Sequence, residues 1–482
     1  MTEQARSGLT SLSTKLFYGS GSIAFGVKDN GFSTLLLLFY NQVVGLPSGL
    51  VGAAIMIALV VDAFLDPIVG QISDNLRSRW GRRHPFMYAS ALPVAISYLF
   101  LWSPPHWSQG ALFIYLVVTA IVVRTFITFY EIPSSALVAE LTGDYDQRTV
   151  FFAWRYFFGW FGGLTMSVLA FRVLLAPDAA HPVGQLNPAG YVNYGIVAAI
   201  IMLAAILISA AGTHRHIPQF HVPPPRRIGA GEMMSEMFAT LANASFLWLT
   251  VSGVFFFAAT GLVFALNIYF QTYLWELSAA QIAIFTVFGF VAAALGLVFA
   301  LPLSRRYGKK SSSIVLFVLA LGIGGTPLAL RLANAFPENG DPVLVPLLLV
   351  FATVSLALSI ASTILMASML TDVVEENAVA TGRRSEGLFF AANSFMQKTS
   401  SAAGVFLSGM LLWLAHFPAG AQPGRIDMGL VRHLALWYLP SLVLLYGIAM
   451  ICLGFYRITR ESHEENLKRL AGEAGQTEAV LD

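Results

Sequence analysis

The sequence predicts an all-α membrane protein, and three observations lead to that class. Of its 482 residues, 56% are hydrophobic and only 11% are charged, whereas soluble domains carry roughly 25% charged residues. The mean hydropathy is +0.69. The apolar residues form continuous runs of about 20 or more, the length that a helix needs to cross a bilayer. A membrane β-barrel would instead show alternating segments of about ten residues, so the spans are expected to be helices.

Twelve apolar runs lie between breaks of Pro, Gly and charged residues. They are predicted at 16–44, 48–73, 85–103, 110–140, 149–176, 190–213, 243–275, 279–304, 313–334, 342–371, 384–417 and 430–457. Since their number is even, both termini lie on one side. Loops on that side hold 20 of the 28 Lys and Arg residues and the other side holds four, a bias typical of cytoplasmic loops. We therefore expect a multi-pass protein of the cell (inner) membrane with both termini in the cytoplasm.

Composition also limits the partners. The net charge of +2 gives no reason to expect a nucleic-acid partner. One cysteine, Cys452, excludes disulfides and Cys-based metal sites within the chain. We find no Ser/His/Asp set, glycine-rich phosphate loop or metal-ligand spacing, so neither an enzyme nor a cofactor is expected. The expected partners are a small-molecule substrate, a coupling cation and the lipid bilayer, and the expected state is a monomer.

A polar stretch divides the spans into two sets of six. It contains three prolines at 223–225 and the pair Arg226-Arg227, which is typical of a linker. The predicted organisation is a first six-helix bundle at 1–213 that carries the cation site, a cytoplasmic linker at 214–242, a second six-helix bundle at 243–457 and a polar cytoplasmic tail at 458–482.

A basic loop recurs in both halves, at 73–83 and at 304–310. Aligning Gly81 with Gly308 superposes Arg79 on Arg306, and the next loops also correspond loosely, Glu140 with Asp372. Two six-helix halves with a repeated loop resemble the major facilitator transporters. We interpret the loops as a cytoplasmic gate that holds the halves together in one state, formed by Asp74, Arg79, Gly81, Arg82, Arg306 and Gly308. The alternative is that these arginines serve topology alone.

Ionisable side chains within the predicted spans are costly and face a cavity or a partner. The acids are Asp29, Asp62, Asp66 and Glu131, and the bases are Lys28, Arg124, Arg155 and Lys398. All four acids lie in the first half, whereas only one base, Lys398, lies in the second. This asymmetry indicates that the cation chemistry belongs to the first six helices.

Asp62 and Asp66 are four residues apart, so both lie on one face of the second span. Their carboxylates repel unless a cation or proton lies between them. Thr128 lies three residues before Glu131 on the fourth span. Three carboxylates and a hydroxyl form a hard oxygen site, suited to Na⁺ at Asp62, Asp66 and Glu131, to H₃O⁺, or to alternating protonation. The alternative is that individual acids merely pair with Arg124 or Arg155.

The remaining charges have two interpretations each. Lys28 and Asp29 are adjacent and diverge by about 100° around a helix, so we expect them to face different partners. Arg155 and Lys398 are expected to donate to hydroxyls or a carboxylate of a substrate, or else to neutralise an acid. For Arg124 we expect a structural ion pair.

At these residues the chain resembles the glycoside–pentoside–hexuronide:cation symporters, the melibiose-permease-like branch of the major facilitators. The similarity covers nearly all twelve spans. It rests on Asp62-Ala63-Phe64-Leu65-Asp66-Pro67, Arg77-Ser78-Arg79-Trp80-Gly81, Gly26-Val27-Lys28-Asp29, Tyr40-Asn41-Gln42, Glu131-Ile132-Pro133 and Gln397-Lys398.

The resemblance implies twelve transmembrane helices in two bundles and symport of a sugar or glycoside with Na⁺ or H⁺ by alternating access. It places Asp62, Asp66, Thr128 and Glu131 in the cation site. It places Asp29, Glu131, Arg155, Lys398 and Lys28 at or near the sugar site.

The chain departs from the melibiose-type pattern at two positions. Glu131 stands where those members have aspartate, and Ser135 stands where they have a tryptophan that stacks on the sugar. Without that platform, a lysophospholipid or other amphiphile remains an alternative cargo. A sensor built on a transporter scaffold is a further alternative. Polar candidates for the cavity wall of the second half are Asn267, Gln271 and Asn393.

Overall fold

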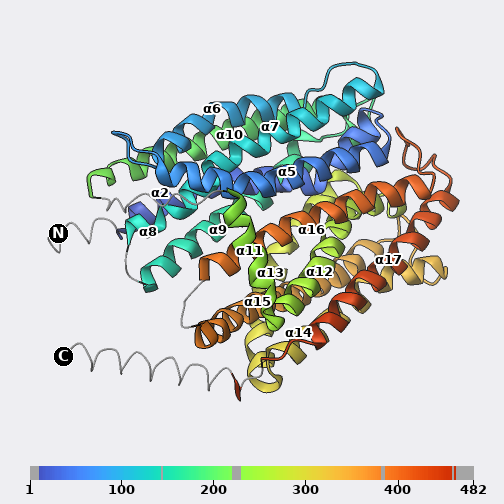
Figure 1. Ribbon diagram of the computed structural model, residues 1–482. Coiled ribbons are helices and arrows are strands. Elements are labelled where there is room, and N and C mark those ends of the chain that lie inside the picture. The colour runs from blue at the N-terminus through green and yellow to red at the C-terminus, as the bar shows by residue number, and fades with distance from the viewer. Residues whose placement is uncertain (1–9, 143–144, 220–229, 382–385, 459–460, 463–482) are drawn as a thin grey trace, which may run out of the picture. The chain divides into compact units, whose positions relative to one another are not determined.

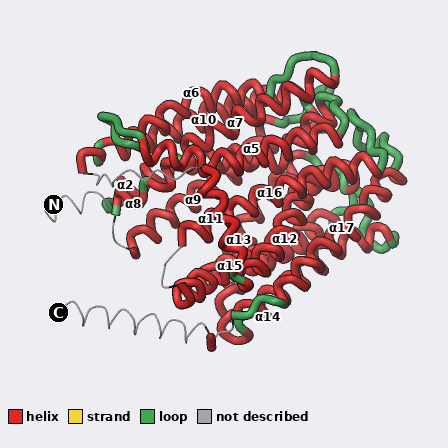
Figure 2. The backbone as a smooth tube through the Cα atoms, viewed as in Figure 1, coloured by secondary structure: helices red, strands yellow, loops and turns green. Residues whose placement is uncertain are grey.

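The computed structural model describes residues 10–142, 145–219, 230–381, 386–458 and 461–462, which form helices joined by loops (Figure 1). Within these ranges there is no strand, and Figure 2 contains only the colours of helix and loop there. The predicted all-α class is therefore confirmed.

The first half contains α-helices and a few short π- and 3₁₀-helical segments. In chain order they are α2 (Leu12–Ser20), α3 (Ser22–Asn30), η1 (Gly31–Leu35), α4 (Leu36–Leu38), η2 (Phe39–Val43), α5 (Ser48–Asn75), α6 (His84–Leu101), α7 (Gln109–Ala136), α8 (Val138–Leu141), α9 (Tyr145–Leu169), η3 (Ala170–Leu174), η4 (Gly184–Leu186) and α10 (Pro188–His214).

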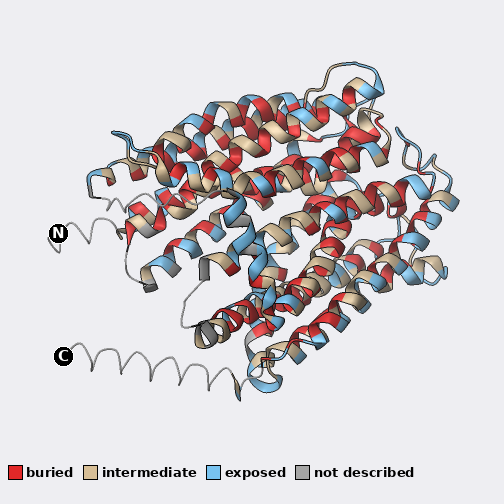
Figure 3. Cartoon of the chain, in the orientation of Figure 1, coloured by how far each residue is buried: buried red, intermediate tan, exposed pale blue. Residues whose placement is uncertain are grey.

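The second half follows a partly helical linker. Its elements are η5 (Ile217–Gln219), α11 (Ala230–Ala239), η6 (Thr240–Ala242), α12 (Ala244–Tyr269), η7 (Phe270–Leu274), α13 (Ala279–Tyr307), α14 (Lys309–Leu332), α15 (Leu344–Thr381), α16 (Glu386–Leu414) and α17 (Met428–Gly454). Figure 3 shows α11 as mainly exposed. The prolines and arginines that marked the linker, at 223–227, lie outside the described residues.

Ten helices of the described chain are long and apolar enough to cross a membrane. Each matches a predicted span, and only the span of α15 differs from its prediction by more than four residues at either end. The predicted span 16–44 is instead a succession of short segments from α2 to η2, none long enough alone. The predicted span 384–417 corresponds to α16, whose polar run at 397–401 lowers its hydropathy.

The chain forms two compact units. The first contains residues 1–230, 263–286 and 405–431, and the second contains 231–262, 287–404 and 432–482. These units are defined by packing, whereas the predicted boundaries at 213, 242 and 457 follow the chain, so those boundaries stay a prediction.

Glycines let α3 and α9 approach closely in the first unit. A Cβ atom at Gly26 would overlap the carbonyl oxygen of Gly159, and a Cβ at Gly163 would lie 2.9 Å from the carbonyl oxygen of Gly26. Small residues at such contacts are typical of membrane helix pairs. The contact fixes Asp29, one turn beyond Gly26, and Arg155, one turn before Gly159, on neighbouring helices.

A tight turn joins η2 to α5 and sets where α5 begins. The N–H of Leu46 donates to the carbonyl oxygen of Tyr40 at 2.8 Å. Gly45 between them has a φ of +88°, which residues with a Cβ rarely adopt. Pro47 precedes the first turn of α5. The helix then runs from this turn to the basic loop after Asn75, and we call its two ends the turn end and the basic end.

Candidate functional site

The centre of the site lies between α5 and α7, which pack side by side in the first unit (Figure 1). Asp62 of α5 is buried, with 1% of its side chain exposed. Its Oδ2 accepts a hydrogen bond from Arg124 Nη2 at 2.8 Å, and its Oδ1 accepts one from Thr128 Oγ1 at 2.8 Å. The predicted ion pair of Arg124 is thus present, and Asp62 is its partner.

Asp66 lies one turn further along the same face of α5 and is half-buried. Its Oδ1 is 3.3 Å from Thr128 Oγ1. The single hydroxyl of Thr128 therefore lies within hydrogen-bonding distance of both carboxylates. A hydroxyl carries only one proton, so it donates to one carboxylate at a time. The structure brings together three of the four residues predicted for the cation site.

Glu131, the fourth residue predicted for the cation site, lies on α7 and is half-buried. Among the described residues, no group of three Asp, Glu, His or Cys side chains is arranged to hold a metal ion. The expected Na⁺ site at Asp62, Asp66 and Glu131 stays a prediction.

Arg155 links α9 to the end of α7. Its Nη1 donates to Ser134 Oγ at 3.0 Å and its Nη2 to the carbonyl oxygen of Glu131 at 3.2 Å. The guanidinium also lies over the ring of Phe25, 5.3 Å from the centroid. Arg155 is buried, and its hydrogen bond to Glu131 is made to the main chain.

Lys28 and Asp29 are bonded to each other, contrary to the expectation that they face different partners. Lys28 Nζ lies 2.5 Å from Asp29 Oδ1. The lysine side chain is 3% exposed and the aspartate 59%. The lysine side chain is long enough to reach the neighbouring carboxylate. Our expectation considered only the 100° between the two residues around the helix and not this length.

Three other candidates belong to different parts of the chain. Lys398 and Asn393 lie on α16 in the second unit and are half-buried. Gln271 is buried in η7 of the first unit. The roles that we expected for these side chains stay predictions.

A second cluster of charges lies at the basic end of α5. Arg82 Nε and Arg83 Nε lie 2.6 and 3.2 Å from Glu140 Oε1, and Arg83 also pairs with Asp74. Arg83 Nη1 donates to Ser73 Oγ at 2.9 Å. Arg83 and Glu140 are 6% and 5% exposed, so their pairing joins the loop to α8 in a buried setting.

The predicted repeat has a structural counterpart in the second unit. Gly81 and Gly308 both adopt positive φ, +72° and +77°. The guanidinium of Arg79 lies over the ring of Trp80 at 5.6 Å, and that of Arg306 lies over Tyr307 at 5.3 Å.

A basic residue shortly after each glycine pairs with an acid of a later helix, Glu140 of α8 or Asp372 of α15. Lys309 Nζ lies 2.6 Å from Asp372 Oδ1 in the second unit, as Arg83 pairs with Glu140 in the first. Our gate prediction did not include the residues of these two pairs, Arg83 with Glu140 and Lys309 with Asp372. The alignment of Glu140 with Asp372 in sequence was the signal that could have found them.

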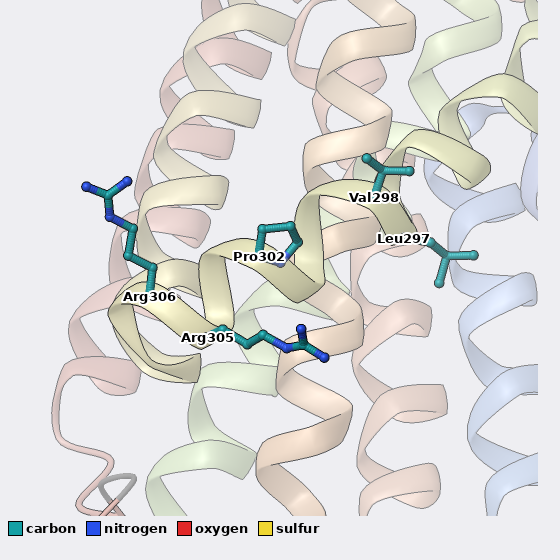
Figure 4. Close-up of a pocket in the computed structure, with 5 residues that line it drawn as sticks. All are labelled: Leu297, Val298, Pro302, Arg305 and Arg306. Carbon is teal, nitrogen blue, oxygen red and sulfur yellow. The ribbon is translucent and has the colours of Figure 1, made fainter.

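Arg306 also lines an open hollow on α13. The hollow measures about 550 Å³ and is lined by Leu297, Val298, Pro302, Arg305 and Arg306 (Figure 4). The two arginine side chains project in different directions from the end of the helix (Figure 4). Arg306 is exposed.

At the turn end of α5, a buried polar network joins segments far apart in sequence. Tyr269 donates to Asn41 Oδ1 at 3.0 Å and Tyr273 donates to Gln42 Oε1 at 3.0 Å. Gln42 Nε2 donates to the carbonyl oxygen of Pro418 at 3.1 Å, and the N–H of Ala421 donates back to Gln42 Oε1 at 2.9 Å. All of these residues belong to the first unit.

Sequence reasoning missed this turn-end network as a functional feature. Asn41 and Gln42 appeared in a family motif, but their partners lie more than 200 residues away. Both segments that contribute side chains to this network, η2 and η7, are π-helical. Such segments occur frequently at functional sites.

Relatives in two bacteria match nearly the whole chain. The putative glycoside/cation symporter YagG of Escherichia coli is 25% identical, with 97% of each chain covered. The isoprimeverose transporter of Lactiplantibacillus pentosus is 22% identical, covering 93% of this chain and 89% of its own. Among solved structures, the inward-open xylose transporter XylE of E. coli aligns with a TM-score of 0.62 at 17% identity, covering 95% of this chain and 98% of XylE.

A family model described as MFS/sugar transport protein matches residues 17–460. The fold, the repeated loops and the relatives agree that the protein is a multi-pass membrane transporter and not an enzyme. The chain belongs to the MFS/sugar transport family, in the glycoside–pentoside–hexuronide:cation symporter branch of the major facilitators.

Proposed function

We propose that the protein carries a sugar or glycoside together with one kind of monovalent cation, Na⁺ or H⁺, by alternating access. The observation that carries this proposal is the arrangement of Asp62, Asp66 and Thr128 between α5 and α7. Carboxylate and hydroxyl oxygens suit a hard monovalent cation. Carboxylates within spans are costly unless they are neutralised, so a cation bound there stabilises the closed, dehydrated state.

We place the substrate next to this site, at Glu131, Arg155 and Asp29. Arg155 presents a buried guanidinium beside Glu131, and the planar donors of a guanidinium suit sugar hydroxyls or a hexuronide carboxylate. Lys28 lies at the same place through its pair with Asp29. Lys398 of α16 is the proposed contact from the second half.

α7 connects the two binding events. Thr128 contacts the cation carboxylates, and Glu131 follows one turn later, where Arg155 holds its main chain. A shift of α7 that accompanies cation binding therefore moves Glu131 and Arg155, the two side chains that we place at the substrate. Coupling of this kind is a free energy shared between the two sites, and it acts in both directions.

Two networks are placed to control access. The turn-end network joins Asn41 and Gln42 to Tyr269 and Tyr273. The cluster at the basic end of α5 contains Asp74 and Arg82 of the predicted gate. In this proposal each network breaks when its end opens. The basic end lies on the cytoplasmic side of the cell membrane, as the distribution of Lys and Arg predicts.

The test is uptake by purified protein in liposomes. Labelled glycosides, pentosides and hexuronates are offered with an inward Na⁺ gradient, an inward H⁺ gradient or neither. We expect accumulation under one gradient and its loss in Asp62→Asn. The matched control is Glu338→Gln, which neutralises an exposed acid and is expected to accumulate like the unmodified protein.

Accumulation that persists undiminished in Asp62→Asn would contradict the assigned cation site. Failure of every sugar under every gradient, with lysophospholipid uptake instead, would contradict the substrate class.

A further inference from the structure

We propose that the hollow on α13 binds an anionic phospholipid. The headgroup phosphate lies at Arg305 and Arg306, and one acyl chain lies along the apolar face of the helix that leads to them. This lipid site is separate from the proposed sugar and cation sites and does not depend on them. The gate role of Arg306 stays a prediction beside it.

The first argument is the position of the two arginines along α13. From Ala279 to Ser304 the helix contains no charged residue. At 1.5 Å per residue this stretch is about 39 Å long, which is longer than the roughly 30 Å of hydrocarbon in a bilayer. Arg305 and Arg306 follow in the last turn of the helix. They therefore lie at the level of the lipid headgroups.

The second argument is the face of α13 that leads to Arg305. Exposed side chains recur along it every three or four residues, which is the spacing of one helix face. They are Ile284, Val287, Val291, Ala294, Val298 and Pro302, and Arg305 continues the same spacing. The part from Val291 to Pro302 is about 16 Å long. This length is roughly half of the hydrocarbon thickness, the depth that the acyl chains of one leaflet fill.

The third argument is the hollow at the end of this face. It measures about 550 Å³, and the five described residues that line it are apolar or cationic (Figure 4). Leu297 and Val298 on its apolar side are 57% and 63% exposed. Guanidinium groups form charge-assisted hydrogen bonds with phosphate oxygens. An apolar wall that ends in two arginines therefore matches the acyl chain and the phosphate of one lipid.

The other two bases of this loop have protein partners and a different exposure. Lys309 pairs with Asp372 at 2.6 Å, and Lys310 donates to two main-chain carbonyl oxygens at 3.1 and 2.9 Å. Both lysines are half-buried, whereas Arg305 and Arg306 are exposed. The two arginines thus present their charge at the surface of the second unit, and exposed basic groups at a membrane surface attract anionic lipids.

The test counts bound lipids by native mass spectrometry of the purified, delipidated full-length protein. The probes are dioleoyl phosphatidylglycerol, which carries a negative charge, and dioleoyl phosphatidylcholine, which has the same acyl chains and no net charge. The variants are Arg305→Gln/Arg306→Gln, Pro302→Glu and the control Arg77→Gln/Arg79→Gln. The control removes two exposed arginines from the corresponding loop of the first half. Melting temperatures identify the variants that fold.

We expect the unmodified protein to prefer phosphatidylglycerol to phosphatidylcholine. Arg305→Gln/Arg306→Gln is expected to bind phosphatidylglycerol about tenfold more weakly, because both cationic contacts to the phosphate are lost. Pro302→Glu places a carboxylate in the hollow, one turn from Arg305, and is expected to weaken phosphatidylglycerol binding by repulsion of the phosphate. Binding of phosphatidylcholine should stay unchanged in both variants, and the control should keep the preference of the unmodified protein.

Equal binding of the two lipids by the unmodified protein would overturn the proposal. So would a control that loses as much phosphatidylglycerol as Arg305→Gln/Arg306→Gln. An excess of inorganic phosphate tests the headgroup alone. It is expected to leave the lipid bound, and displacement would show a site for free anions that needs no acyl chain. If the arginine variant does not fold, Pro302→Glu decides, since unchanged phosphatidylglycerol binding in that variant would also overturn the proposal.

Discussion

At the scale of single residues, the charges within the membrane are arranged in pairs and shared contacts. Asp62 pairs with Arg124, and Lys28 pairs with Asp29. Sequence reasoning placed Asp62 and Asp66 on one face with Thr128 opposite, and the structure brings these three together. It left open which acid Arg124 pairs with, and the structure shows that this acid is Asp62. The reason is that the reach of a long arginine side chain across helices depends on tertiary packing and not on spacing along the chain.

The buried acid at the basic end provides a prediction of stability. Glu140→Ala removes the partner of Arg82 and Arg83 and leaves both guanidinium groups without their shared carboxylate. Breaking a buried pair costs about 3–5 kcal/mol, so the melting temperature of the purified protein should fall clearly. Asp74→Ala removes a half-exposed carboxylate from the same cluster and should cost much less. Equal losses in the two variants would contradict the buried pairing.

His216 provides a prediction of pH dependence. Burial, and then the neighbouring Arg215, hold the pKa of His216 below its ordinary value. Its Nε2 also lies 3.2 Å from Arg215 Nε and 3.0 Å from Thr14 Oγ1. Because the folded protein disfavours the protonated ring, the unfolded chain binds more protons once the pH falls below about 6.5. The stability from neutral His216 is therefore complete above that pH and is lost as the pH falls toward the lowered pKa.

The measurement is the melting temperature of the unmodified protein and of His216→Gln between pH 5 and pH 8. We expect the difference between them to shrink as the pH falls, because glutamine does not titrate. His106→Gln, at an exposed loop position, is the matched control. A difference that is constant across this range would show that His216 does not contribute as described.

At the scale of elements, hydropathy predicted where the spans begin and end. Ten of the predicted spans are present as helices of suitable length and composition in the described chain. Hydropathy did not predict that the first span is divided into α2, α3 and π-helical segments. A change from i→i+4 to i→i+5 hydrogen bonding adds no polar residue, so it leaves no mark in the composition.

The contact between α3 and α9 depends on glycine. Gly26→Val would place a branched side chain against the carbonyl oxygen of Gly159. Overpacking at such a contact costs about 1–3 kcal/mol, and the displaced helices should also weaken substrate transport through Asp29 and Arg155. Gly49→Ala, where a Cβ meets no atom within 4 Å, should keep its melting temperature. Equal melting temperatures and equal transport in the two variants would contradict the role of this contact.

At the scale of the whole molecule, the repeat was the most informative feature of the sequence. Gly81 and Gly308 share a positive φ, and each precedes a basic residue that pairs with an acid of a later helix, α8 or α15. This correspondence could be predicted because it connects short motifs at a fixed spacing from glycine. The turn-end network could not, since its hydrogen bonds join residues more than 200 positions apart.

The turn-end network also predicts a conformational effect. Tyr273→Phe removes the hydroxyl that contacts Gln42 Oε1 and the carbonyl oxygen of Ala421. One hydrogen bond contributes about 1 kcal/mol, so opening at this end should become about fivefold more frequent. Hydrogen exchange of the amides in 39–46 should rise accordingly. Tyr115→Phe, which removes a hydrogen bond to the carbonyl oxygen of Phe100, should leave exchange in 39–46 unchanged.

The central claim is that sugar and cation move together through the site between α5 and α7. The most direct test offers no ion gradient at all: labelled sugar is added outside proteoliposomes, and Na⁺ or H⁺ entry is followed as the sugar runs down its own gradient. The account predicts that sugar addition drives entry of one of these cations in the unmodified protein. It also predicts that Asp66→Asn, at the second carboxylate near Thr128, abolishes this entry. Sugar entry with no accompanying movement of either ion would contradict the account.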